Sequence, residues 1–143
     1  MLTVTDLSVR YGQIEALRGL GLSVTKGSVT VLLGSNGAGK SSTLNAITGL
    51  AQPRGRIACE GARIDGVAPE DIVRRGIALC PEGRRVFPSL SVAENLHLGG
   101  AVHARGEALA ARVEAELARF PILRERFHQK AGLLSGGEQQ MLA

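Results

Sequence analysis

A glycine-rich stretch carries the residues with the clearest chemistry in this chain: Gly34-Ser35-Asn36-Gly37-Ala38-Gly39-Lys40-Ser41. Its spacing is G-x-x-x-x-G-K-[ST], and its glycines let the backbone adopt conformations that side chains forbid, so that successive N–H groups can converge on a phosphate. The ammonium of Lys40 can reach the β- and γ-phosphate oxygens, the hydroxyl of Ser41 can bind magnesium, and Ser42 is available to a phosphate. An apolar run ends at Leu33 just before the stretch, and a helix is expected just after it. This setting favours a phosphate-binding loop over a glycine-rich turn with a surface lysine.

A second stretch, Leu134-Ser135-Gly136-Gly137-Glu138-Gln139, has the features of another anion site. Ser135 supplies a hydroxyl, the glycine pair allows close backbone approach, and a helix expected to begin near Glu138 directs its positive end outward. An isolated Ser-Gly-Gly would be explained by a serine cap before two flexible residues. The stretch resembles the signature motif of ABC-type ATPases, however, and its distance from Lys40 also fits that family.

The composition is that of a soluble globular protein, with 143 residues, 44% hydrophobic and 21% charged. No apolar run approaches the roughly 20 residues of a membrane helix, and no leader pattern is present, so a cytoplasmic protein is expected. The net charge of +4 is scattered along a chain with one tyrosine and three phenylalanines, which argues against nucleic-acid binding. Cys59 and Cys80 lie in apolar, strand-like contexts and are expected to be reduced core residues.

Alternating apolar residues predict strands in the first part of the chain, over residues 2–9 and 20–24. The apolar runs 29–33 and 77–80 predict buried strands, the former in a parallel sheet. Further elements are expected as follows: a helix over 40–48 closed by Gly49, a strand over 56–59, a turn at Glu60-Gly61 and a helix over 69–75.

Helical patterns dominate the second part. Ser91-Val92-Ala93-Glu94 is a capping-box pattern, and the helix that it opens is expected to end at Gly99-Gly100. Residues 106–120 carry an apolar face and stop before Pro121. The predicted organisation is therefore a β-rich, phosphate-loop part over residues 1–87 and a helical part over residues 88–143.

The resemblance to ABC-type ATPases covers residues 1–143 and implies an α/β fold: a P-loop NTPase with an amino-terminal antiparallel β subdomain and a helical subdomain. It implies ATP and Mg²⁺ as ligands, with Tyr11 stacking on the adenine. Glu82 stands where most members carry a glutamine that senses magnesium and the transporter. A carboxylate there could bind the metal or its water, or Glu82 could be a turn residue near Arg84 and Arg85.

The segment Pro81-Glu82-Gly83-Arg84-Arg85-Val86-Phe87-Pro88, with Ser91 to Leu96 behind it, resembles the ATP-binding subunit of bacterial branched-chain amino acid importers. That resemblance implies coupling of ATP binding and hydrolysis to uptake, at the inner face of the plasma membrane. Its partners would be membrane-spanning permease subunits and a second ATPase subunit, bound head-to-tail with Lys40 facing Ser135 and Gly137 of the other copy. Phe87 would belong to the permease-binding surface or to the core.

Other functions stay open. The cargo could be urea, a short amide or another compound, and the chain could be a non-functional fragment that binds nucleotide. A P-loop kinase or soluble P-loop ATPase is disfavoured by the signature stretch.

The catalytic residues of the family are expected after Ala143. Members carry an apolar strand ending in Asp-Glu after the signature motif, then a histidine, whereas His97, His103 and His128 all precede it here. The chain alone is therefore expected not to hydrolyse ATP. We also expect it to be the amino-terminal part of a longer protein or the product of a damaged gene, with the parallel neighbours of residues 29–33 missing.

Overall fold

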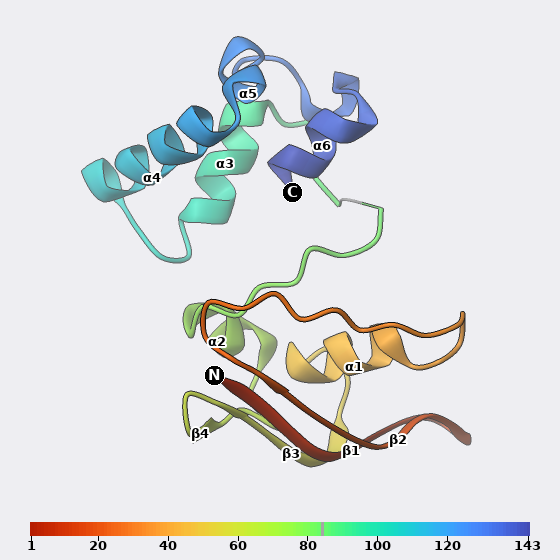
Figure 1. The fold of residues 1–143 in the computed structure, drawn as a ribbon. Coiled ribbons are helices and arrows are strands. Elements are labelled where there is room, and N and C mark those ends of the chain that lie inside the picture. Colours follow the sequence, from red (N-terminus) through yellow and green to blue (C-terminus); the bar gives the residue numbers. More distant parts are fainter. Residues whose placement is uncertain (84) are drawn as a thin grey trace. The chain divides into compact units, whose positions relative to one another are not determined.

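Four antiparallel strands form a sheet in the order β2-β1-β3-β4 (Figure 1). The bounds are β1 Leu2–Tyr11, β2 Ile14–Val24, β3 Pro53–Cys59 and β4 Ala62–Arg63. The computed structural model describes residues 1–83 and 85–143, so Arg84, expected near Glu82, lies outside the described residues. The described residues divide into two units, Met1–Leu79 and Cys80–Ala143. The antiparallel amino-terminal sheet that the family resemblance implies is confirmed.

The core of the first unit lies between the sheet and helix α1 (Lys40–Ile47), which covers one face of the sheet (Figure 1). Val4, Leu7 and Val9 of β1 are buried in this core. Leu7 reaches the same face as Val4 because the strand is irregular between them, where the pairing register shifts and Asp6 has a φ of 50°. The helix contributes Ala46 and Ile47. Helix α2 (Pro69–Arg74) follows, with proline in its first turn as expected.

Two predicted strands are absent from the described structure. Residues 29–33 and 77–80 have no strand assignment, and Val29 and Leu33 are 92% and 85% exposed. A parallel strand obtains its backbone hydrogen bonds from neighbours in the sheet, and the described strands pair only among themselves. The expectation of buried strands is therefore wrong for this structure. Cys80 is exposed for the same reason, and only Cys59 packs partly buried against the core.

Helices make up the second unit. They are α3 (Val92–Gly100), α4 (Gly106–Arg119), α5 (Pro121–Glu125), the 3₁₀ helix η1 (Ala131–Leu133) and α6 (Gly136–Leu142). The capping box at Ser91 is confirmed, and α3 ends at Gly100 as predicted. Val113 and Leu117 of α4 are buried with Val92 and Leu123 in a core of this unit's own.

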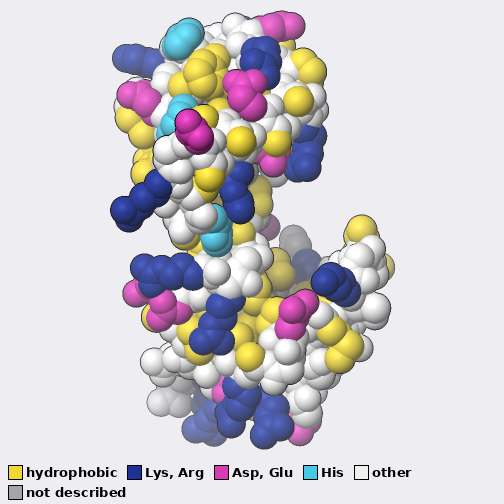
Figure 2. Space-filling model, turned by 90° about the vertical axis from the view of Figure 1, so that its left-hand side faces the viewer, with side chains coloured by type: hydrophobic (Ala, Val, Ile, Leu, Met, Phe, Trp, Pro, Cys, Tyr) yellow, Lys and Arg dark blue, Asp and Glu magenta, His cyan; other side chains and the backbone are white. Residues whose placement is uncertain are grey.

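Charged side chains are spread over both units. Figure 2 shows Lys and Arg side chains with Asp and Glu among them, and a group of basic side chains at the lower end, over the strands of the sheet. Among the described residues, no helix has both the length and the hydrophobicity that crossing a membrane requires.

Candidate functional site

The loop before α1 has backbone conformations that residues other than glycine rarely adopt. Gly37 and Gly39 have φ values of 85° and 87°, in the left-handed region. A Cβ atom on Gly39 would lie 2.6 Å from the carbonyl oxygen of Ala16 and 3.1 Å from a methyl carbon of Leu17. Strand β2 therefore packs directly against Gly39, the N-cap of α1.

Lys40 closes the loop with its side chain. Its Nζ donates to the carbonyl oxygens of Gly34 and Ser35, both at 2.7 Å. A lysine ammonium has three N–H donors, so one donor remains after these two bonds. The lysine thus both holds the loop in shape and keeps a positively charged donor for a ligand.

The first turn of α1 has no side-chain cap. Its N-cap is Gly39, and the turn contains no acidic residue. The backbone N–H groups of the first turn of a helix have no partner within the helix, and they add to its positive end. Ser41 is exposed and Ser42 half-buried, so their hydroxyls lie at the same helix start. This arrangement of donors can bind an anion such as a phosphate.

Thr43, in the first turn of α1, supports this loop and was missed by sequence reasoning. It is 1% exposed, and both its backbone N–H and its hydroxyl donate to the carbonyl oxygen of Gly39, at 2.8 and 2.9 Å. The sequence signal for this contact is a hydroxyl residue four positions after the last glycine of the loop. Threonine side chains at this spacing in a helix can donate to the carbonyl oxygen four residues earlier.

Tyr11 lies at the end of β1, opposite Ile14 of β2, and is 47% exposed. Ala16 lies two residues after Ile14 in β2, and its carbonyl oxygen packs against Gly39. The turn between β1 and β2 therefore lies beside the phosphate loop. Figure 1 shows both at the same end of the sheet. The turn that Tyr11 precedes therefore lies at the same end of the sheet as the loop.

The second stretch opens α6, which begins at Gly136 rather than near Glu138. Ser135 is its N-cap: the Ser135 N–H donates to the Glu138 carboxylate at 2.6 Å, and the Glu138 N–H donates to the Ser135 hydroxyl oxygen at 3.3 Å. This is a second capping box, and the pattern S-x-x-E could have revealed it. Ser135 and Gly137 are exposed, whereas the Glu138 carboxylate turns back onto its own helix.

A cation adjoins this capping box. Arg126 Nε lies 3.0 Å from Glu138 Oε1. The hydrogen bonds from the Ser135 backbone and side chain, followed by the charge of Arg126, lower the pKa of Glu138. Sequence reasoning missed Arg126, because its contact depends on how the chain folds between α5 and α6.

Glu82 is exposed in a turn with Gly83. An open hollow of about 530 Å³ lies here, lined by Cys80, Pro81, Glu82, Gly83 and Gln140. Gln140 Nε2 lies 3.5 Å from the Cys80 sulfur. In residues 1–83 and 85–143, no group of three or more His, Cys, Asp and Glu side chains is placed to hold a metal ion.

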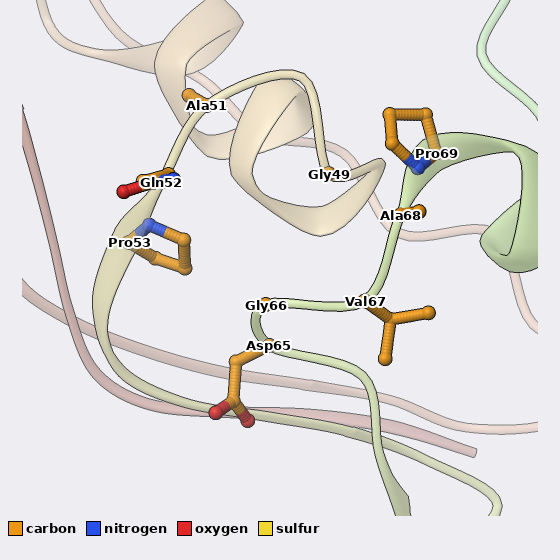
Figure 3. A pocket seen from close by; sticks show the side chains of 9 residues that line it. All are labelled: Gly49, Ala51, Gln52, Pro53, Asp65, Gly66, Val67, Ala68 and Pro69. Atoms are coloured by element: carbon orange, nitrogen blue, oxygen red, sulfur yellow. The ribbon is translucent and has the colours of Figure 1, made fainter.

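Another hollow, of about 470 Å³, lies in the first unit between the end of α1 and the start of α2 (Figure 3). Its lining consists of Gly49, Ala51, Gln52, Pro53, Asp65, Gly66, Val67, Ala68 and Pro69. The Asp65 carboxylate accepts a hydrogen bond from the Ile57 N–H at 3.0 Å and bonds with the Arg63 guanidinium. The charge of Asp65 is therefore paired within the protein. This hollow has fewer groups free to bind a ligand than the phosphate loop has.

Known proteins resemble this chain along its whole length. The family described as ABC transporter matches residues 17–143. The chain is 44% identical to the high-affinity branched-chain amino acid transport ATP-binding protein BraG of Pseudomonas aeruginosa and 38% identical to the probable branched-chain amino acid transport ATP-binding protein LivF of Archaeoglobus fulgidus. Both matches cover 100% of this chain and 61% of the relative. The chain thus spans less than two thirds of the length of these relatives.

The fold has solved counterparts. MJ1267, an ATP-binding cassette of an ABC transporter, matches 99% of this chain with a TM-score of 0.87 and 28% identity, and this chain covers 62% of it. The same cassette in its ADP conformation matches with a TM-score of 0.80. These comparisons confirm the expected fold class. With its phosphate loop, its signature stretch and matches of this extent, the chain belongs to the ABC transporter family, among the ATP-binding cassettes.

Proposed function

We propose that the phosphate loop of this chain binds ATP together with Mg²⁺. The observation that carries the proposal is the set of donors at one helix start: the remaining N–H of Lys40 and the uncapped first turn of α1. The loop fits a phosphate because Gly39 has no side chain and its backbone is held against β2. The ADP conformation of the related cassette MJ1267 also supports a nucleotide ligand.

The ligand's other parts have candidate partners as well. Ser41, exposed at the helix start, would hold Mg²⁺ along with phosphate oxygens. The ion would supply positive charge that neutralises the phosphates. Glu82 would act on the metal or its water, and Tyr11, with its half-exposed ring, would stack on the adenine.

The complete protein is proposed to be the ATP-binding subunit of an importer for branched-chain amino acids. The names of the relatives BraG and LivF support this cargo. Urea, a short amide or another cargo is the alternative, because the cassette that binds ATP need not touch the compound that the permease carries. ATP binding and hydrolysis would drive uptake at the inner face of the membrane.

Two partners belong to this proposal. A second subunit would bind head-to-tail, so that Ser135, Gly136, Gly137 and Glu138 of one copy approach the nucleotide held by the loop of the other. A permease would contact Phe87, whose side chain is 55% exposed. Asn95 holds the backbone of Phe87 from both sides, accepting from its N–H at 2.9 Å and donating to its carbonyl oxygen at 3.1 Å. An exposed aromatic ring on a fixed backbone suits a partner contact.

We expect the 143-residue chain by itself to bind nucleotide without hydrolysing it. Its sequence contains no Asp-Glu pair after the signature stretch to polarise the attacking water. A non-functional nucleotide-binding fragment would behave in the same way, so hydrolysis by this chain does not discriminate between the two.

Nucleotide binding by a Lys40→Ala variant tests the proposal. Loss of one charged donor to a phosphate weakens ATP binding by roughly 10- to 100-fold. Isothermal titration calorimetry with MgATP measures the effect. Lys26→Ala is the matched control, because Lys26 is an exposed lysine of the same unit outside the loop, and it should bind ATP like the parent. Equal binding by Lys40→Ala and the parent would contradict the proposal.

A further inference from the structure

The chain contains two capping boxes, one at the start of α3 and one at the start of α6. At α3, the Ser91 N–H donates to the Glu94 carboxylate at 2.7 Å, and the Glu94 N–H donates to the Ser91 hydroxyl oxygen at 3.2 Å. The box at α6 has the same pair of bonds, within 0.1 Å of these lengths. Among the described residues, only the second box has an ion pair, which joins Arg126 to Glu138.

The position of Arg126 is set by its neighbours. It is the residue directly after α5, and its Nη1 donates to the side-chain oxygen of Gln129 at 3.1 Å. Gln129 in turn donates to the carbonyl oxygen of Leu133, just before the signature stretch. The Nε atom is buried without a well-directed hydrogen bond, so attraction between charges is what joins it to Glu138.

The charge of Glu138 poses a problem for a phosphate site. The carboxylate lies within one helical turn of Ser135 and Gly137, and a negative charge at that distance repels an anion. The Glu138 side chain is only 16% exposed, so water screens it less than a surface carboxylate. Arg126 supplies the compensating charge and at the same time braces the carboxylate that caps the helix.

We propose that Arg126 is a positioning residue of the signature motif, which offsets the charge of Glu138 and holds the first turn of α6 so that the motif can accept a phosphate. The proposal rests on the proposed function, in which this motif approaches the nucleotide of a second subunit. Arg126 acts through Glu138 and does not itself contact the ligand. Its importance should therefore disappear when Glu138 has no charge.

The experiment compares Arg126→Gln, Arg126→Lys, Glu138→Gln and the double variant Arg126→Gln/Glu138→Gln in the 143-residue chain. Arg119→Gln is the matched control, because Arg119 pairs with Glu116 at 3.1 Å on the exposed side of α4. The first readout is the carboxyl titration of Glu138 by ¹³C NMR. Arg126→Gln should raise the pKa of Glu138, Arg126→Lys should largely restore it, and Glu94 should be unchanged, which also verifies that the unit is folded.

The second readout is the binding of inorganic triphosphate, followed through the backbone amide signals of Ser135 and Gly137. We expect Arg126→Gln to weaken this binding about fivefold, with a smaller effect at high salt. In the Glu138→Gln background the same substitution should change binding less than about twofold. A smaller effect in the absence of the Glu138 charge distinguishes charge compensation by Arg126 from a general structural role.

Three outcomes would overturn the inference: unchanged binding in Arg126→Gln, equal weakening with and without the charge of Glu138, or no triphosphate-induced shifts at Ser135 and Gly137 in the parent chain. The phosphate-loop proposal is tested separately in the same spectra. Signals of Gly37 and Gly39 should respond to triphosphate in the parent and lose that response in Lys40→Ala, whatever happens at the signature motif.

Discussion

Asp65 shows how one side chain can organise a loop without acting on a ligand. Its carboxylate joins the backbone of β3 at Ile57 to the guanidinium of Arg63 on β4. These hydrogen bonds, from Arg63 first and then from the Ile57 N–H, lower the pKa of Asp65 to about 2. The sequence could not indicate this role, because an aspartate before a glycine is equally typical of any turn.

The titration of Asp65 predicts a pH dependence of stability. Because its pKa is lower in the folded state than in the unfolded state, its contribution is fully present above about pH 4 and is lost as the pH falls toward 2. Allowing for screening at the exposed Arg63, this contribution is about 1–2 kcal/mol. Asp65→Asn should lower the free energy of unfolding by that amount at pH 7 and flatten its change below pH 4, as measured by urea denaturation.

Asp71→Asn is the control for Asp65→Asn, since Asp71 pairs with Arg74 on the exposed side of α2. It should change the free energy of unfolding by less than about 0.5 kcal/mol. If both variants lose the same stability, the hydrogen bonds of Asp65 are not the cause.

Elements with local signals were predictable, and elements that depend on distant partners were not. The capping residue at Ser91, the proline at the start of α2 and the glycine after α1 are signals within the helices themselves. The run 29–33 has the right composition for a strand, but a strand also needs a partner, which composition does not reveal. Helix α6 begins at Gly136, earlier than the start near Glu138 that the sequence predicts, because a glycine pair is more typical of a loop than of a helix.

Contact between two distant segments supports the signature stretch. The Ala131 N–H donates to the Leu90 carbonyl oxygen at 2.8 Å, and the Gly132 N–H donates to the Pro88 carbonyl oxygen at 3.0 Å. The segment that contains Phe87 is thereby bonded to the segment that leads into α6. The sequence gives no sign of this pairing, since some 40 residues separate the partners.

Gly132→Ala tests this contact. A Cβ atom at Gly132 would lie 3.0 Å from the Pro88 carbonyl oxygen and 3.1 Å from the Pro88 Cβ, closer than a well-packed contact. We expect a loss of about 1–3 kcal/mol in the free energy of unfolding of the second unit, measured by hydrogen exchange of the α6 amides. Gly99→Ala in α3 is the control: a Cβ there meets nothing within 4 Å, so the variant should be neutral or slightly stabilised. Equal exchange rates in both variants would contradict a close approach at Gly132.

At the scale of the whole molecule, the candidate site residues are divided between the two units. Tyr11 and the phosphate loop belong to the first unit, and Glu82 and the signature stretch belong to the second. Short, continuous motifs in the sequence indicate the phosphate loop and the signature stretch, whereas Tyr11 and Glu82 are candidates only through the family resemblance. The geometry within each group, such as the Lys40 bonds and the Arg126–Glu138 pair, required the folded structure.

The exposed apolar run is a property of the whole chain that predicts its behaviour in solution. Val29, Val31 and Leu33 are 92%, 70% and 85% exposed, and their segment has no strand partner in the described residues. Apolar, extended segments of this kind associate edge to edge. Replacing Val29 and Val31 by lysine should therefore reduce aggregation of the 143-residue chain, measured by light scattering over time. Because both side chains are exposed, the free energy of unfolding should change by less than about 1 kcal/mol.

Val9→Lys, at a fully buried position of β1, should instead unfold the first unit and increase aggregation. If the double lysine variant unfolds as Val9→Lys does, residues 29–33 are packed inside the protein in solution, and the parallel strand expected from the sequence forms after all.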